Sequence, residues 1–354
     1  MLGWYRQPAP AHYARGIRCH CRCLWSDGYS LAEERGGSAV PCPRVARLGS
    51  CKGMAMLSVY VTIDVDPDYV NASGDRSSLS WQCLDLMPKI LEEFETRGIP
   101  LTLFLRADHQ IRDMMGGFLG LYEKASELWN AASARGHELA WHPHLYRREG
   151  NSYAPLRDPA ACAEQLDECG EALARSGLGL SSVRIGEAWH SAATMIKLDE
   201  LGFEVDSTAV PGRKRADTLR SFDWEPTTNS PYHPSRGDYR VSGQAPLNIL
   251  EVPMTTSPIQ TSYDAAPIRR YLNPTFRREL FSDALRNLRS AEPAAEVQTI
   301  VVIFHPDELL DRPGNDLHDY SWEGFAANLD LLTQTLDASH SDHGFRTLRD
   351  ARSA

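Results

Sequence analysis

Short apolar runs alternate with longer amphipathic segments along the chain from residue 57 onward. Runs rich in β-branched and aromatic residues predict buried strands, whereas apolar residues three and four positions apart predict helices, several of which end at a glycine. The predicted strands cover residues 59–65, 101–105, 137–142, 182–186, 203–208, 248–254, 299–305 and 345–348. The predicted helices cover residues 80–97, 118–135, 159–175, 191–201, 274–288 and 322–336.

The order of these elements predicts an α/β protein. Strands that alternate with helices of ten or more residues form parallel sheets, either open or closed into a barrel. Residues 211–246 interrupt the alternation with little periodicity, so we expect a long irregular insertion there. The sequence contains no internal repeat and no glycine-rich phosphate-binding motif, so a nucleotide-binding fold has no support.

The first 53 residues differ in composition from the rest of the chain. They contain eight Lys and Arg against three Asp and Glu, and five of the eight cysteines. The cluster Cys19-His20-Cys21-Arg22-Cys23 allows a metal or redox site, but it lacks the Cys-x-x-Cys pairing of zinc sites. We therefore expect residues 1–55 to be a disordered or artefactual extension, and residues 56–354 to form one domain.

The whole chain has the composition of an acidic globular protein, with 42% hydrophobic residues, 24% charged residues and a net charge of −10. The negative charge argues against a nucleic-acid partner and against binding to an anionic membrane surface. No apolar run is long enough for a transmembrane helix, and the N-terminus lacks the pattern of a secretory signal. We therefore expect a cytoplasmic protein in which Cys83, Cys162 and Cys169 are reduced thiols.

Polar residues gather where four of the predicted strands end. Because side chains alternate along a strand, Asp64 and Asp66 are expected on the same side. Two carboxylates so close share a cation or a proton, or one acts as a base; the alternative is a solvated acidic turn. Parallel folds build their sites at this edge of the sheet. The four strand ends carry Asp64 and Asp66, His142 and His144, Arg184 and Glu187, and His305 and Asp307.

Several segments of the chain resemble the motifs of the polysaccharide deacetylases, which are also called NodB-homology or carbohydrate esterase family 4 proteins. The resemblance spans about residues 57–350 and follows the order of the family motifs. The first segment stands in place of Thr-Phe-Asp-Asp-Gly, the second in place of Gly-His-Glu-Ile-x-x-His, and the last is an apolar strand that ends in His. The segments are Thr62-Ile63-Asp64-Val65-Asp66, Gly136 to His144, Arg184-Ile185-Gly186-Glu187, Leu201 to Ser207, and Val302-Ile303-Phe304-His305.

This resemblance implies a distorted (β/α)7-type barrel, in a single catalytic domain, that removes an N-acetyl or other N-acyl group from a sugar or glycan precursor. In such a site a metal polarises the amide and activates a water, a carboxylate takes the proton of the water, and a His protonates the leaving amine. The implied roles are Asp64 as general base, Arg184 as the residue that orients it, His305 as general acid, and Asp66, His142 and His144 as metal ligands. Zinc is the expected metal, with cobalt, nickel and manganese as alternatives.

The chain departs from the family pattern at three positions. Val65 separates two acids that are usually adjacent, which resembles a divergent Asp-x-Asp branch that includes lipid-linked aminoarabinose deformylases. The second metal His usually lies four residues after the first, where this chain has Tyr146, so we expect His144 to replace it. The third motif lacks its proline, which makes the placement of Arg184 depend on the loop.

Most of these residues also have a structural interpretation, which the sequence leaves open. Asp66 could cap the turn, the two histidines could be polar strand-end residues, and Arg184 could pair with Glu187 on a rim. His137 is expected to be structural. Trp189 could stack on a sugar ring or belong to the core, and residues 232–239 could recognise substrate or form a solvated lid.

Three functions therefore remain open at the level of the sequence. The first is a deacetylase that acts on a small-molecule or oligosaccharide substrate, and the expected location favours a soluble sugar intermediate over cell-wall polymer. The second is a hydrolase of another small amide, such as a formyl group or a ring ureide. The third is a catalytically inactive barrel that binds carbohydrate, which is disfavoured because the catalytic residue types are present. The oligomeric state is not predicted.

Overall fold

The computed structural model describes most of the chain after the proposed extension. The extension itself, residues 1–55 with its five cysteines, lies outside the described residues, so its predicted disorder is not tested. The three later cysteines are unpaired thiols and are buried, as expected. The described residues are 56–68, 79–217, 221–290, 299–339 and 342–353.

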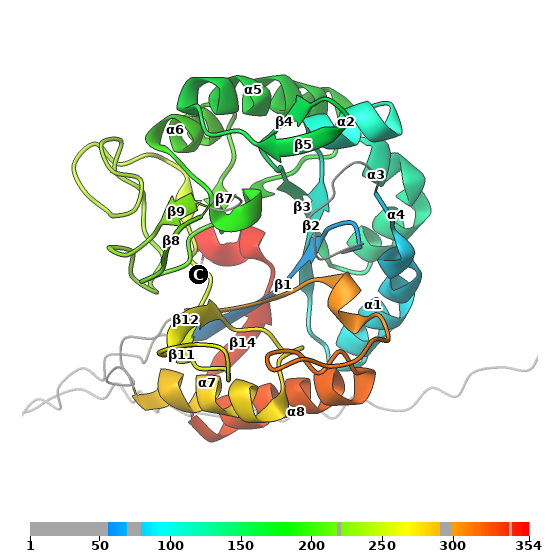
Figure 1. Ribbon diagram of the computed structural model, residues 1–354, viewed down its shortest axis with the longest axis vertical. Coiled ribbons are helices and arrows are strands. Elements are labelled where there is room, and N and C mark those ends of the chain that lie inside the picture. The colour runs from blue at the N-terminus through cyan, green and yellow to red at the C-terminus, as the bar shows by residue number, and fades with distance from the viewer. Residues whose placement is uncertain (1–55, 69–78, 218–220, 291–298, 340–341, 354) are drawn as a thin grey trace, which may run out of the picture. The chain divides into compact units, whose positions relative to one another are not determined.

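A curled sheet of parallel strands forms the centre of the fold (Figure 1). All residues of its two longest apolar runs are buried, because helices or the barrel interior cover both faces of a parallel sheet. The strands follow the order β10 (Leu250–Glu251), β7 (Val205–Asp206), β6 (Ser182–Val183), β3 (Glu138–His142), β2 (Leu101–Arg106), β1 (Leu57–Val65) and β13 (Thr299–Phe304), and β14 (His343–Arg346) pairs with β1.

The two edge strands of this sheet, β10 and β13, do not pair with each other. Irregular segments cover the exposed edge of β13 instead. Leu272 forms an isolated parallel bridge with Val302, and the hydroxyl of Thr255 accepts the N–H of Val301. The sheet is therefore an incompletely closed barrel, which confirms the predicted distorted (β/α)7-type fold.

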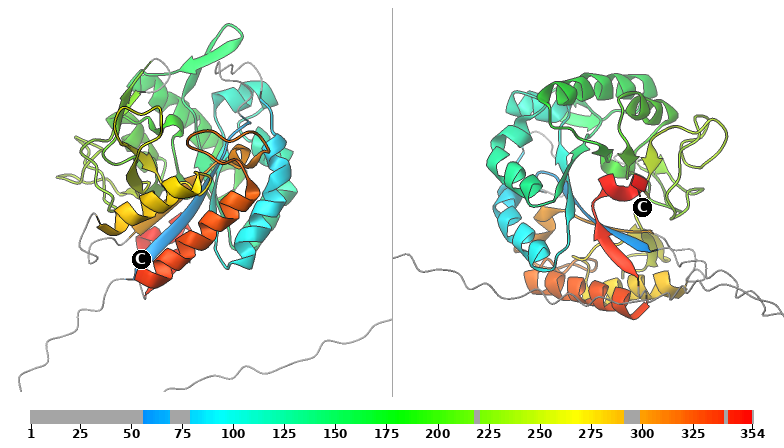
Figure 2. Two further views of the ribbon diagram at one scale, coloured as in Figure 1. Left: turned by 60° about the horizontal axis from the view of Figure 1, so that its bottom comes forward. Right: turned by 180° about the vertical axis from the view of Figure 1, so that it is seen from behind.

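Helices surround the sheet on its outer side, and the view from behind shows the same ring (Figure 2). Their apolar faces pack on the outward residues of the strands, such as Val59, Val61 and Ile63 of β1, in one large core. The helices are α1 (Met87–Thr96), α2 (His109–Met115), α3 (Gly120–Lys124), α4 (Ser126–Ala134), α5 (Pro159–Ser176), α6 (Ala192–Glu200), α7 (Arg278–Ser290) and α8 (Trp322–Ser339).

The barrel interior is divided into an apolar end and a polar end. Tyr60 of β1 points inward and packs in a small cluster with Phe104 and Leu348, the first residue of the short helix η4 (Leu348–Ser353). The N–H of Leu348 donates to the hydroxyl of Thr102, which fixes η4 across this end. Because alternate residues of β1 share a face, Asp64 also points inward, at the opposite, C-terminal end of the strand.

Some predicted elements differ in the structure. The helix predicted over 118–135 is two helices, broken at Ala125, where the carbonyl of Leu121 accepts the indole N–H of Trp129. The strands predicted over 203–208 and 248–254 each shorten to two paired residues, because the sheet curls away at this edge. The sequence also gave no signal for α2 or for three hairpins, β4 (Tyr146–Glu149) with β5 (Ser152–Pro155), β8 (Lys214–Ala216) with β9 (Ser221–Asp223), and β11 (Thr256–Ile259) with β12 (Ile268–Tyr271).

Candidate active site

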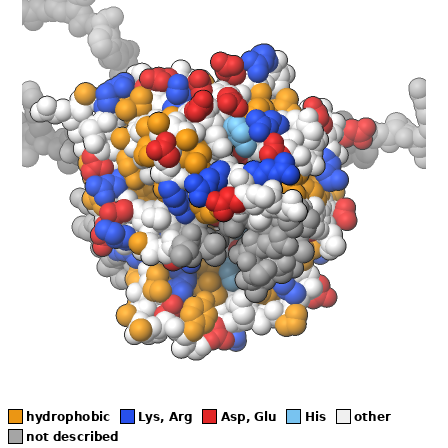
Figure 3. All heavy atoms as spheres, turned by 45° about the horizontal axis from the view of Figure 1, so that its top comes forward, with side chains coloured by type: hydrophobic (Ala, Val, Ile, Leu, Met, Phe, Trp, Pro, Cys, Tyr) orange, Lys and Arg blue, Asp and Glu red, His pale blue; other side chains and the backbone are white. Residues whose placement is uncertain are grey.

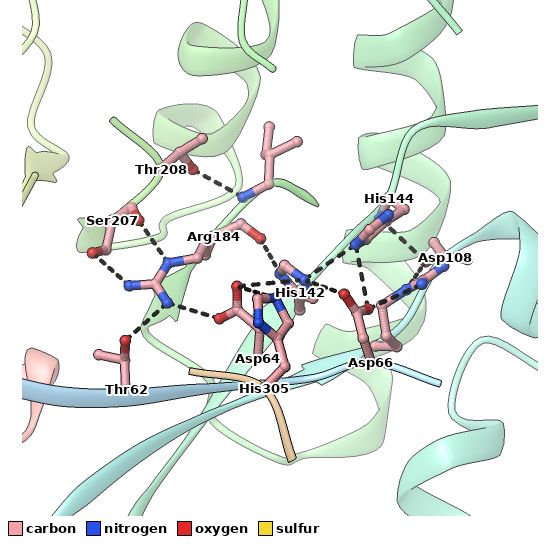
Figure 4. A network of polar contacts seen from close by, with 12 residues as sticks. Thr62, Asp64, Asp66, Asp108, His142, His144, Arg184, Ser207, Thr208 and His305 are labelled. Atoms are coloured by element: carbon pink, nitrogen blue, oxygen red, sulfur yellow. Dashed lines mark hydrogen bonds and ion pairs between the residues drawn. The ribbon is translucent and has the colours of Figure 1, made fainter. Parts of the chain in front are cut away.

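The first predicted acid, Asp64, lies inside the barrel and is only 4% exposed. The Nη1 atom of Arg184 donates to its Oδ1 atom at 2.7 Å and to the hydroxyl of Thr62 at 2.9 Å. The Nε and Nη2 atoms of Arg184 donate to the carbonyl and hydroxyl of Ser207, and its guanidinium lies over the ring of Phe104. Arg184 is thus held on all sides and orients one oxygen of Asp64, leaving Oδ2 to face the cavity (Figure 4).

The three predicted metal ligands come together at the end of β1 and β3 (Figure 4). The Nε2 atom of His144 lies 3.3 Å from Oδ1 of Asp66, and the Nε2 atom of His142 lies 3.7 Å from Oδ2 of Asp66. The two Nε2 atoms are 3.2 Å apart. The second oxygen of Asp64 is 3.8 Å from His142, so both acids of the Asp-x-Asp segment face the same histidine.

The hydrogen-bond partners of the two imidazoles assign their tautomers. The Nδ1 atom of His142 lies 2.7 Å from the carbonyl of Arg184, which can only accept, so this nitrogen carries the proton. The Nδ1 atom of His144 lies 3.0 Å from the hydroxyl of Tyr146, which itself donates to Glu187 at 2.6 Å. Both Nε2 atoms are therefore unprotonated, and their lone pairs face each other and the carboxylate of Asp66.

This donor set fits a divalent cation. Two lone pairs and a carboxylate at such short distances repel one another unless a positive charge lies between them. A tetrahedral site with bonds of about 2.0–2.2 Å separates its ligand atoms by about 3.4 Å. This is close to the 3.2 Å between the two Nε2 atoms and to the 3.3 and 3.7 Å from each Nε2 atom to a different oxygen of Asp66. Two imidazoles and one carboxylate leave further coordination positions open, as catalytic sites require.

The surroundings of the three candidate ligands favour the protonation states that metal ligands need. Burial raises the pKa of Asp66, but its contacts with His144 and His142 outweigh burial and hold that pKa well below the usual range. Burial, and secondly the charge of Arg106, lower the pKa of His144. An ionised carboxylate and a neutral imidazole are thus the stable forms.

Arg106, at the end of β2, is a site residue that the sequence analysis missed. It is 2% exposed and lies between two acids, donating to Asp66 at 3.1 Å and to Asp108 at 2.6 Å. Asp108 in turn caps α2 through the N–H of Ile111 and accepts the N–H of His144. A polar residue at the end of a fifth strand was the signal that could have indicated Arg106.

The segment after β6 supports His144 from the other side. A Cβ atom on Gly186 would lie 2.1 Å from the ring of His144, so only glycine allows the imidazole to take this position. The next two residues, Glu187 and Ala188, both have left-handed backbone angles, with φ of 59° and 55°. This strained turn aims the carboxylate of Glu187 at Tyr146, which completes the chain of hydrogen bonds to His144.

His305 follows β13 and lies on the other side of Asp64. Its Nε2 atom is 4.0 Å from Oδ2 of Asp64, and its Nδ1 atom is 3.4 Å from Oε1 of Glu308. Asn273 and Thr275 donate to Oε2 of Glu308 and fix that carboxylate. Burial lowers the pKa of His305, but the charge of Glu308 outweighs burial and raises the pKa to about 10. His305 is therefore a protonated side chain at neutral pH, with its acidic hydrogen available to the cavity.

Comparisons with known proteins show which folds are similar to the fold of this chain. No protein-family model matches the sequence, and no curated protein matches it. The structure is similar to the Puue allantoinase, with a TM-score of 0.50, 15% identity and coverage of 84% of this chain and 90% of that chain. The chain shares the fold of this allantoinase.

Two further solved structures match over most of their length. A protein from Mycobacterium smegmatis assigned to the polysaccharide deacetylases matches with a TM-score of 0.46 and 14% identity, over 86% of this chain and 91% of that chain. A family 4 carbohydrate esterase from Streptomyces lividans in complex with acetate matches with a TM-score of 0.35 and 11% identity, over 81% and 90%. At such identities the likeness concerns the fold, and the function has to be argued from the site.

The candidate residues open into a cavity of about 430 Å³. All six residues predicted for the site line it. The residues 232–239 are absent from its described lining, since Tyr232 and Tyr239 bind each other and the backbone of His190. The predicted recognition role of this segment therefore has no support.

The contacts of Arg184, His137 and Trp189 bear on the structural interpretations that the sequence leaves open. Arg184 pairs with Asp64 and not with Glu187. His137 is structural, as expected, because its Nδ1 atom accepts the N–H of Leu101. Trp189 packs against the large core, outside the described lining of the cavity. Among the described residues, no helix is both long and apolar enough to cross a membrane.

Proposed function

We propose that this protein is a metal-dependent hydrolase that removes an acyl group from the nitrogen of a sugar or glycan precursor. The observation that supports this most directly is the facing pair of Nε2 lone pairs on His142 and His144, closed by Asp66 and flanked by Asp64. When bound by these three ligands, a divalent cation polarises an amide carbonyl and lowers the pKa of a water molecule. We propose zinc as this cation, with cobalt, nickel and manganese as alternatives.

The other residues of the site provide the proton transfers. Oδ2 of Asp64 takes a proton from the attacking water, because Arg184 occupies only Oδ1 and keeps the carboxylate oriented. The C–N bond of the amide then breaks, and His305 gives its Nε2 proton to the leaving nitrogen. Asp64 and His305 are close enough, at 4.0 Å, to serve the two ends of one scissile bond.

Hydrolysis of a cyclic ureide is the second candidate function. The similarity of the fold to the allantoinase supports it, because hydrolysis of a cyclic ureide also breaks an amide-type C–N bond. The shape of the substrate, and not the proton-transfer residues, separates the two functions.

A release assay on the purified full chain tests both candidates. The chain is loaded in turn with zinc, cobalt, nickel or manganese and offered N-acetylated sugars, N-formylated sugars and allantoin. We expect acetate or formate from the sugars, metal-dependent and absent in Asp64→Asn. Ring opening of allantoin alone would favour the second candidate.

Two outcomes would overturn the proposal. If no divalent ion binds after reconstitution and melting is unchanged by metal, the metal site does not exist. If metal binds but no substrate is cleaved while neutral oligosaccharides bind, the protein is the inactive carbohydrate-binding barrel considered from the sequence. The cytoplasmic location stays a prediction, to be tested by fractionation of cells.

A further inference from the structure

Three arginines line the cavity that the proposed chemistry does not use: Arg213, Arg215 and Arg312. The face of the molecule drawn in Figure 3 carries acidic, basic and hydrophobic side chains in mixture, without a broad patch of one sign, and the net charge of the chain is −10. Because a negatively charged protein does not attract anions over a distance, a role for these arginines is local, inside the cavity.

Arg312 is held in place by a built aromatic support. Its guanidinium lies 3.9 Å from the ring centre of Tyr320, and the ring of Tyr320 also stacks with the ring of His318, with an angle of 9° between the two rings. Tyr320 takes a left-handed backbone conformation, with φ of 56°, and its hydroxyl accepts a hydrogen bond from Asn315. Strained backbone of this kind gathers where a ligand is bound, and stacking restricts the guanidinium to one plane.

The hydrogen-bonding capacity of Arg312 is not satisfied within the described part of the chain. Its Nε atom is buried and has no hydrogen-bond partner there. Its Nη2 atom is 3.6 Å from Oδ2 of Asp307, which is longer than a hydrogen bond. Burial raises the pKa of Asp307 to about 6, so this carboxylate is largely ionised at neutral pH and pairs with Arg312 only at this longer distance. The side chain of Arg312 is 32% exposed and makes no hydrogen bond within the described part of the chain, so its terminal N–H groups are available to a ligand in the cavity that it lines.

The hairpin β8–β9 contributes the other two arginines from a distant part of the sequence. Arg213 lies 5.7 Å from the ring centre of Phe222, and Arg215 binds Asp217 through its Nε atom. Arg215 is thus partly neutralised by its own neighbour. Of these three arginines, Arg213 and Arg312 lie over aromatic rings.

We propose that the substrate carries an anionic group, a carboxylate or a phosphate, beside the acylated nitrogen, and that Arg312, assisted by Arg213, binds this group. The inference rests on the proposed function, which it deepens by naming the substrate class. Planar guanidinium groups bind the paired oxygens of carboxylates and phosphates in a bidentate manner, whereas neutral hydroxyls satisfy them poorly. The anionic group would orient the substrate, and a neutral analogue would lack the charged acceptor that the guanidinium of Arg312 binds.

Matched substrates test the inference by kinetics. The metal-loaded full chain is assayed with N-acetylglucosamine, its 1-phosphate, and N-acetylmuramic acid, which carries a carboxylate. We expect kcat/KM to be at least about tenfold higher for one anionic member than for the neutral sugar, and Arg312→Met to remove most of that ratio. The better of the two anionic probes identifies phosphate or carboxylate as the natural group. Arg286→Met, an exposed arginine on α7, is the matched control and should keep the ratio.

Binding of inorganic phosphate to the same metal-loaded proteins, measured by calorimetry, separates this inference from the proposed function. If Arg312→Met weakens phosphate binding by about tenfold or more and Arg286→Met does not, the anion site stands even if no acyl group is released. Acyl release with equal kcat/KM for neutral and anionic probes, and phosphate binding unchanged in Arg312→Met, would overturn the anion site while the proposed function stands.

Discussion

The imidazole rings of His142 and His144 meet edge to face, with their Nε2 atoms 3.2 Å apart and both Nδ1 atoms engaged elsewhere. A His-x-His pair at the end of a strand would ordinarily place its two side chains on one face without bringing the nitrogens together. Here the contacts of the two Nδ1 atoms, with the carbonyl of Arg184 and the hydroxyl of Tyr146, hold the rings so that the two Nε2 lone pairs converge. The predictions below follow from this arrangement and from the residues that hold it.

Substitutions of the two aspartates of the Asp-x-Asp segment should have different effects on metal content and on kcat. Asp66→Asn removes a negative ligand and should lower metal content, measured by elemental analysis after dialysis. Asp64→Asn keeps an oxygen for Arg184 and should retain the metal, while kcat falls by at least about 100-fold because the base is lost. Full metal content in Asp66→Asn, or metal loss in Asp64→Asn alone, would reverse the two assignments.

Gly186→Ala should displace His144. The added Cβ atom would lie 2.1 Å from the imidazole, so the ring has to move away from Asp66 and His142. We expect much weaker zinc binding in a competition titration, with the far-ultraviolet circular dichroism unchanged. Gly117→Ala is the control, because a Cβ atom there meets no atom within 4 Å. Zinc affinity equal in both variants would show that His144 is not a ligand.

Tyr146→Phe should lower the affinity for the metal without removing a ligand. The variant keeps the ring but deletes the hydroxyl that links Nδ1 of His144 to Glu187. Loss of such an outer contact typically costs about 10- to 100-fold in metal affinity. Tyr153→Phe deletes a hydroxyl that binds Asp113 instead, and should leave the affinity unchanged. A Tyr146→Phe variant with unchanged affinity would mean that Gly186 and Asp108 suffice to orient His144.

Glu308→Gln should shift the pH dependence of catalysis. Glu308 raises the pKa of His305 to about 10, and a general acid acts only in its protonated form. Activity is therefore present below the pKa of His305 and lost as pH rises through it. Without the charge of Glu308 that pKa falls, so the alkaline limb of the kcat/KM profile should move to lower pH. An unmoved alkaline limb would show that another group sets it.

Glu251→Gln should flatten the pH dependence of stability. Burial, and secondly the charge of Asp206, raise the pKa of Glu251 well above its usual value. Because the folded state binds this proton more tightly than the unfolded state, the free energy of unfolding falls as pH rises above about 4.3, the ordinary value for Glu. Urea denaturation at pH 5 and pH 8 should show a smaller difference for Glu251→Gln than for wild type. Glu123→Gln, an exposed position on α3, is the control.

The order of elements and the strand-end residues could be predicted because they depend on local patterns. Apolar runs identify β1 and β13, and period-two alternation already places Asp64 and Asp66 on one side of β1. Parallel strands carry their C-terminal ends to the same edge, so Asp64, Asp66, His142, His144, Arg184 and His305 were expected together before any contact was known. The lengths of β7 and β10, which have only two paired residues each, were overestimated because strand length at this edge depends on the curl of the sheet.

Only the tertiary structure decided how these side chains are held. Arg106 binds Asp66 across 40 positions and Arg184 binds Asp64 across 120, and no local pattern encodes such pairs. The left-handed turn at Glu187 connects Tyr146 to a carboxylate 41 residues away, and Arg312 reaches the cavity from a loop without periodicity. The sequence alone determined which residues gather at the edge of the sheet, since strand geometry is periodic. Their hydrogen bonds, charges and tautomers arise from contacts that exist only once the chain has folded.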